Sequence, residues 1–194
     1  MTETTCRALL AAIVLFAAGT TTTPAAEPAR VRIETSAGNI VVQLESERAP
    51  LSVANFLRYA RDGFYEGTIF HRVVSGFVIQ GGGYDEQLAL RPPRPGIPNE
   101  SGNGLVNRRG TIAMARTADP HSADAQFYIN LADNLVLDPK PTRWGYAVFG
   151  EVVEGLEVVD EIGHQATATR GEMPDVPVKP AIIRKVVVLS GPAP

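Results

Sequence analysis

Cysteine is almost missing from this sequence of 194 residues, which contains only Cys6. From position 27 onward the chain has no thiol at all. A disulfide scaffold needs paired cysteines and a thiol enzyme needs a nucleophilic one. Both classes of protein are therefore excluded for the part of the chain that follows residue 26.

An excess of positive charge is also absent, because 18 lysines and arginines stand against 21 aspartates and glutamates, giving a net charge of −3. Nucleic-acid-binding domains usually carry a basic stripe, and the pairs at 108–109 and 184–185 are too short to form one. We therefore expect no nucleic-acid partner. The length favours one domain with a substantial core.

Histidine is scarce, with only His71, His121 and His164, and their spacing is not that of metal ligands. We therefore expect neither a metal site nor another cofactor. Ser122 and Asp124 lie close to His121, but no nucleophile-elbow motif surrounds them. A hydrolase is accordingly disfavoured.

One apolar run, from Ala8 to Gly19, follows Arg7 and precedes small residues that end at Ala25 and Ala26. A basic start, a short apolar core and small residues are typical of a secretory signal. The run is shorter than the roughly 20 residues that span a bilayer, so an uncleaved anchor is the weaker alternative. We expect a signal peptide at 1–26, a linker at 27–30, one domain at 31–190 and a tail at 191–194. The mature protein is then exported and not inserted in a membrane.

The rest of the chain is dominated by short β-like runs. In the segment 31–44 apolar and polar residues alternate on both sides of a turn at 36–39, which predicts a β-hairpin. Helical spacing occurs at Val53, Phe56, Leu57 and Ala60, before Gly63, and again at 155–163. At least eight strands and two helices favour a mainly β fold, a closed antiparallel barrel capped by the helices, with an open sandwich as the alternative. The Pro- and Gly-rich stretch 84–109 is expected to be a functional or disordered loop.

The segment FHRVVSGFVIQGG, residues 70–82, places polar groups on an apolar surface. In an extended strand Phe70, Arg72 and Val74 share one face, and Val78 and Gln80 share a face of the next run. By composition this is a core hairpin with a surface arginine and an edge glutamine.

A resemblance changes that interpretation. FHRVVSGFVIQGG resembles the signature of the cyclophilin family of peptidyl-prolyl isomerases. The segments VANFLRYARDGFYEGTIFHRV, GTIAMARTADPHSADAQFYINLADN and YAVFGEVVEGLEVVDEI resemble further cyclophilin segments in the same order. The resemblance covers about residues 31–190 and implies an eight-stranded antiparallel barrel with two capping helices. The segments NESGNGL, ARTAD and GYAVFG are most similar to those of exported bacterial members, which implies a periplasmic location.

The resemblance also implies a site. Arg72 stands at the position of the catalytic arginine, with Gln80 as the polar residue beside it. The walls of the proline pocket are implied at Phe77, Val78, Tyr128 and Leu137, with Tyr146 where many eukaryotic members carry a histidine. The groove for residues before proline is implied at Ala115, Arg116 and Gln126. His71 is expected on the opposite strand face, in a structural role.

The implied activity is cis–trans isomerisation of peptide bonds before proline, which would speed the folding of exported proteins. The implied partners are proline-containing polypeptides, and the family suggests a monomer. The alternative is a cyclophilin-like module that binds proline segments, or acts as a chaperone, without turnover. The presence of Arg72 favours the enzyme.

The sequence departs from the family at three positions. Val136 replaces the tryptophan of cyclosporin-sensitive members, so we expect weak cyclosporin inhibition with activity retained. Val78 replaces a methionine, and Tyr128 a phenylalanine, that are commoner in the family. The Tyr128 hydroxyl then needs a polar partner or water.

Overall fold

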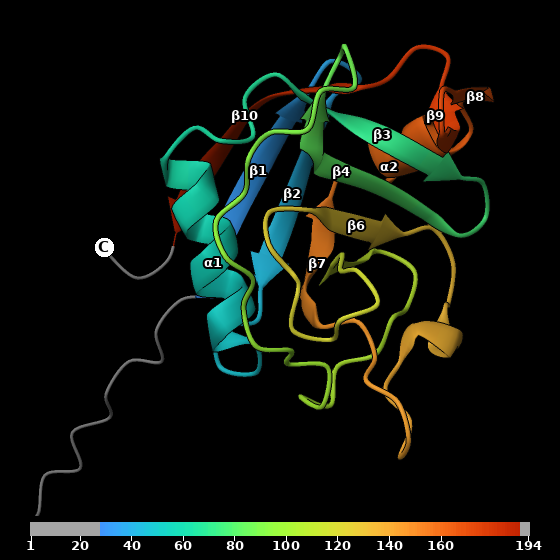
Figure 1. Cartoon of the computed structure of the whole chain (residues 1–194). Helices are drawn as coiled ribbons and strands as arrows, with labels where there is room; N and C mark the ends of the chain where they lie inside the picture. The colour runs from blue at the N-terminus through green and yellow to red at the C-terminus, as the bar shows by residue number, and fades with distance from the viewer. Residues whose placement is uncertain (1–27, 191–194) are drawn as a thin grey trace, which may run out of the picture.

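The computed structural model describes residues 28–190, so the expected signal peptide and C-terminal tail lie outside the described residues. Eight strands form a closed barrel in the order β1-β10-β3-β4-β6-β5-β7-β2, and all neighbours are antiparallel (Figure 1). Their bounds are Arg30–Thr35 (β1), Asn39–Leu44 (β2), Thr68–Val74 (β3), Val78–Asp85 (β4), Thr111–Met114 (β5), Phe127–Asn130 (β6), Val148–Glu154 (β7) and Ile182–Ser190 (β10). The closed barrel is confirmed over the open sandwich.

The first hairpin follows its alternating pattern. β1 ends at Thr35 and β2 begins at Asn39, which confirms the predicted turn. The Thr35 hydroxyl donates to the Gly38 carbonyl at 2.7 Å and closes that turn. β1 begins at Arg30, inside the stretch expected to be a linker.

The helix α1 spans Pro50–Arg61, with proline in its first turn. Gly63 follows the C-cap with φ +68, as the sequence predicts. Its N–H donates to the Ala60 carbonyl, and the Phe64 N–H donates to the Tyr59 carbonyl. These two bonds form a Schellman motif, and the Tyr59 and Phe64 rings pack 4.6 Å apart beside it.

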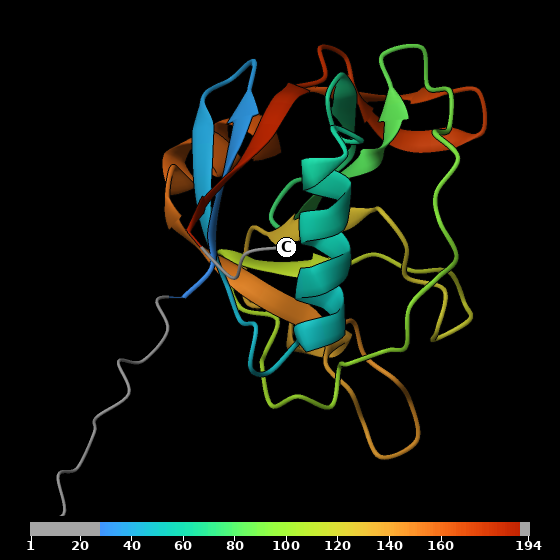
Figure 2. The ribbon, with the colours of Figure 1, turned by 90° about the vertical axis from the view of Figure 1, so that its left-hand side faces the viewer.

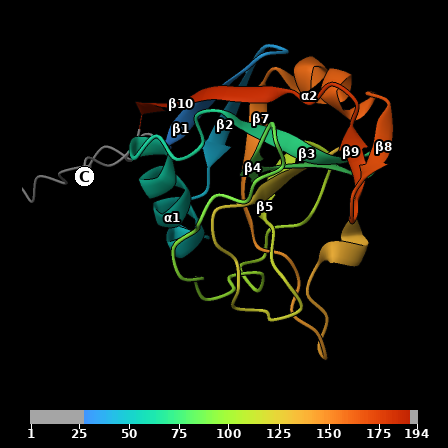
Figure 3. The same cartoon turned by 45° about the horizontal axis from the view of Figure 1, so that its top comes forward.

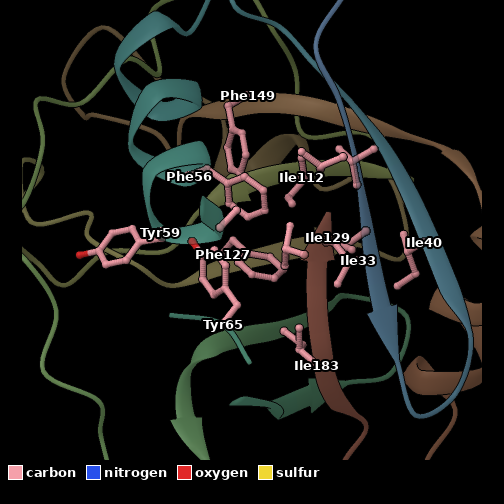
Figure 4. Close-up of a cluster of buried hydrophobic side chains, with 14 of the residues drawn as sticks. Ile33, Ile40, Phe56, Tyr59, Tyr65, Ile112, Phe127, Ile129, Phe149 and Ile183 are labelled. Carbon is pink, nitrogen blue, oxygen red and sulfur yellow. The ribbon is translucent and has the colours of Figure 1, made fainter. Parts of the chain in front are cut away.

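The core fills the inside of the barrel. Figure 4 shows Phe56, from α1, directed toward Phe127 and Phe149 of β6 and β7. Figure 2 shows α1 alongside the barrel. The helix α2, Leu156–Gly163, adds Val159 and Ile162 to the same buried cluster. None of the helices among residues 28–190 is long and apolar enough to cross a membrane.

The stretch between β4 and β5 is irregular but tied to the fold. Glu100 accepts hydrogen bonds from the Leu51 and Ser52 amides and from the Ser52 hydroxyl. Because Ala49 offers no side-chain cap, this carboxylate satisfies the first amides of α1 from a distant loop.

A second, two-stranded sheet was not predicted. It consists of β8, Thr167–Arg170, and β9, Met173–Pro177. Figures 1 and 3 show this hairpin beside the C-terminal end of β3. All four residues of β8 are exposed, so the alternation that reveals a strand in a sequence is missing. A short 3₁₀ turn, Leu135–Leu137, lies between β6 and β7.

Candidate active site

Four neighbouring strands, β4, β6, β5 and β7, present different side chains on their two faces. The inward residues Ile79, Phe127, Ile112 and Phe149 belong to the main core. Because side chains alternate along a strand, the residues next to them point outward. These outward residues, Val78, Ala113, Tyr128 and Val148, form a second apolar cluster with Ala115, which follows β5, and the cluster is edged by Phe77, Leu105, Leu137 and Tyr146. The candidate site is built on this outer cluster.

A cavity of about 250 Å³ opens on the outer cluster. It is lined by Arg72, Phe77, Val78, Gln80, Ala115, Arg116, Tyr128, Leu137 and Tyr146. The structure thus brings together nine of the ten residues that the sequence singled out. The tenth, Gln126, lies in an adjoining cavity of about 210 Å³ that shares Gln80, Ala115 and Arg116.

Tyr128 forms an apolar wall with a satisfied polar end. Its hydroxyl donates to Asn107 Oδ1 at 2.7 Å, and the fully buried Asn107 also accepts from Asn130. Burial raises the pKa of Tyr128, so the hydroxyl stays protonated and acts only through this bond. Asn107 is a site residue that the sequence did not reveal, because it lies in a loop without periodicity.

Arg116 lines both cavities. Its guanidinium lies 4.5 Å from the centre of the Tyr146 ring and donates to the carbonyls of Gly145, Thr117 and Trp144. Three donors and a ring face hold the group in place, so Arg116 acts as a fixed wall.

The polar edge of the main cavity comes from β3 and β4. Arg72 stands opposite Gln80 in the strand register. The Gln80 amide donates to Gln126 Oε1 at 3.1 Å, which links the two cavities. A Cβ at Gly83 would lie 2.5 Å from the Gln126 side chain, so glycine at that position makes room for it. Arg72 also pairs with Asp175, whose Oδ2 is 3.5 Å from Nε.

Residues 30–188 match the family model of the cyclophilin type peptidyl-prolyl cis-trans isomerases/CLD. The chain belongs to the cyclophilin family. A peptidyl-prolyl cis-trans isomerase A of Dickeya dadantii is 46% identical over 184 residues, covering 93% of this chain and 97% of that protein. For isomerase B of Escherichia coli the identity is 49% over 161 residues, covering 81% and 98%. A solved cyclophilin from Cryptosporidium parvum has a TM-score of 0.70 at 26% identity, covering 85% and 99%.

One prediction for this cyclophilin signature is wrong. Phe70, Arg72 and Val74 do not share a face, because the β3–β4 register shifts between Phe70 and Arg72. This bulge puts Phe70 and Val73 into the main core while Arg72 lines the cavity. Val78 and Gln80 do share the cavity face, as predicted.

His71 is buried beside the cyclophilin site but does not line it. It is 3% exposed, its ring lies 4.6 Å from that of Tyr84, and its Nδ1 has no hydrogen-bond partner. Burial lowers the pKa of His71 to about 4, so the ring is neutral at physiological pH. This environment fits the predicted structural role.

The remaining candidates do not assemble into a hydrolytic or metal centre within residues 28–190. The Ser122 hydroxyl bonds to Thr117 and Asp119, whereas His121 accepts from the Asn99 amide. No group of three or more His, Cys, Asp and Glu side chains in this part of the chain is arranged to hold a metal ion.

Proposed function

We propose that this cyclophilin isomerises peptide bonds preceding proline, with Arg72 as the catalytic residue. The observation that carries the proposal is a cavity in which an apolar wall meets the Arg72 guanidinium, while the second guanidinium, that of Arg116, is taken up by three carbonyls and the Tyr146 ring. The apolar wall suits a pyrrolidine ring, and the adjoining cavity suits the residues before it. No nucleophile or acid–base pair is needed, because the reaction breaks no covalent bond.

Rotation about the peptide bond changes the hydrogen-bonding capacity of the prolyl nitrogen. The barrier of about 18–20 kcal/mol comes from amide resonance. In the twisted transition state the prolyl nitrogen becomes pyramidal and regains its lone pair. A guanidinium is always a donor and never an acceptor, so it can bond to that nitrogen. The planar ground state offers no such acceptor, and the contact therefore favours the transition state selectively.

The proposed substrates are exported polypeptides, and the proposed location is the periplasm. The apolar run from Ala8 to Gly19, followed by Ala25 and Ala26, supports this assignment. The protein then works as a monomer on chains that arrive unfolded. Intact-mass measurement of protein recovered from the periplasm tests the export: loss of residues 1–25 or 1–26 is expected. Protein that keeps these residues and stays with the membrane contradicts it.

A protease-coupled assay on a proline-containing peptide tests the activity with wild type, Arg72→Ala and Arg32→Ala. Arg32 is a matched control, because its side chain is 36% exposed against 37% for Arg72 and each pairs with one carboxylate. We expect Arg72→Ala to lower kcat/KM about 100-fold, the usual effect of removing one transition-state donor, and Arg32→Ala to leave it unchanged. Equal rates for wild type and Arg72→Ala would refute the catalytic assignment. A wild type that binds the peptide without turnover would instead identify a binding module.

A further inference from the structure

The β8–β9 hairpin contains an irregularity next to the polar edge of the site. Ala168 pairs with Val176 and Arg170 pairs with Met173, so the register shifts between them. Thr169 of β8 therefore faces two residues of β9, Pro174 and Asp175. Such a bulge turns a side chain out of its regular direction, and bulges are common beside active sites.

Asp175 adopts the left-handed backbone conformation at the bulge, with φ +60. Within residues 28–190 only one other non-glycine residue, Leu88, has a positive φ. Asp tolerates this conformation better than most residues, yet it remains strained. The next residue, Val176, is fully buried, and its packing fixes the backbone of Asp175 in this conformation. The hairpin is thus anchored so that the Asp175 side chain leaves it in an unusual direction.

That direction leads to Arg72. The Oδ2 atom of Asp175 lies 3.5 Å from Nε of Arg72, and β9 packs against β3. The contact is an ion pair without a hydrogen bond, and among the described residues no other carboxylate pairs with Arg72. Since the carboxylate approaches Nε, the terminal nitrogens are left for the cavity that Arg72 lines.

From this geometry we propose that Asp175 is a positioning residue for the isomerase reaction. Its carboxylate holds Nε of Arg72 and so restrains a long, flexible side chain with the terminal nitrogens directed at the bound prolyl group. The inference rests on the proposed function and adds to it a residue from outside the cavity. Both side chains are partly exposed, 37% and 40%, so the pair orients the guanidinium more than it stabilises the fold.

The test compares Asp175→Gly and Asp175→Asn with wild type, because glycine and asparagine both accept a positive φ. Asp160→Asn is the matched control: its carboxylate also pairs with an arginine, Arg109, and is 35% exposed, but it does not line the site. Catalysed exchange of a proline peptide at saturation gives kcat, and peptide titration gives the dissociation constant. We expect both Asp175 variants to lower kcat about threefold to fivefold, the size of an exposed ion pair, with the dissociation constant within twofold of wild type.

A double-mutant cycle separates positioning from a general structural effect. In the Arg72→Ala background, Asp175→Gly is expected to change kcat by less than twofold. Nitrogen relaxation of the Arg72 Nε–H group should report greater mobility in Asp175→Gly than in wild type, and no change from wild type in Asp160→Asn. The proposal is overturned if Asp175→Gly keeps full kcat, or if it lowers kcat equally with and without Arg72. If Arg72→Ala already equals wild type, the proposed function fails first, and Asp175 has no catalytic arginine to position.

Discussion

The inner and outer faces of the barrel wall differ although the same strands form both. On β6, Phe127 points inward and packs its ring against Phe56, Tyr65 and Phe70. The next residue, Tyr128, points outward and lines the open cavity. The inner face is closed by large side chains, whereas the outer face combines apolar side chains, two alanines among them, with a few polar groups and leaves a cavity open. Stability and chemistry are thus carried by adjacent residues of one strand.

The strongest test of this comparison removes an inner side chain. Phe127→Ala should lower the free energy of unfolding by about 3–5 kcal/mol, because it leaves a cavity among the packed rings. Urea unfolding measures the loss. Isomerase activity of the molecules that remain folded should change little, since Phe127 does not line the cavity. A loss below about 1 kcal/mol would show that the inner face does not carry the stability.

His71 provides a second test, because it is a buried polar residue that does not line the cavity. Its pKa is about 4 in the folded protein and near 6.5 when unfolded. As the pH falls from 6.5 to 4, the unfolded chain takes up a proton that the folded chain does not. The contribution of His71 to the free energy of unfolding is therefore complete above pH 6.5. It falls by about 3 kcal/mol as the pH drops toward 4 and changes no further below that pH.

Unfolding curves between pH 7 and 4 measure this effect. His71→Gln should flatten the pH dependence, whereas His121→Gln, at an exposed position, should keep it. Identical slopes for wild type and His71→Gln would show that the ring is not a buried neutral group.

Val136 tests the rim of the outer face. It is 62% exposed and adjoins Leu137 of the cavity. Val136→Trp should strengthen cyclosporin inhibition about tenfold, equal to about 1.4 kcal/mol of added burial, with isomerase activity retained. Inhibition assays on the two proteins give the ratio. Nanomolar inhibition of the wild type would contradict the expectation of weak binding.

The smallest effect is expected at the Tyr128 hydroxyl. Tyr128→Phe should cost about 1 kcal/mol of stability, the net value of one hydrogen bond, because Asn107 keeps its bond from Asn130. Activity should stay within twofold, since the apolar wall remains. A large loss of kcat in this variant would place the hydroxyl in the reaction and contradict the assignment of Tyr128 as an apolar wall of the cavity.

Most of this arrangement could be predicted from the sequence, and the parts that could not be predicted have physical causes. Alternation placed Val78 and Gln80 on one face because β4 is regular there. The same alternation gave the wrong face for Phe70. A bulge depends on how the strand pairs with its partner, so the residues of the bulged strand do not reveal it. Tyr128 and Leu137 were assigned by resemblance alone. The pairing of Asp175 with Arg72 was not predicted, because the two residues are remote in sequence. The β8–β9 segment also lacks the alternation of apolar and polar residues that indicates a strand.

The most direct measurement is exchange spectroscopy on a proline-containing peptide, which follows both isomers without a coupling enzyme. Wild type is predicted to produce exchange between the cis and trans peptides at substoichiometric protein. Arg72→Ala is predicted to bind the peptide with similar affinity and to produce about 100-fold slower exchange. Undiminished exchange in Arg72→Ala would contradict the claim that the outer face catalyses through its arginine.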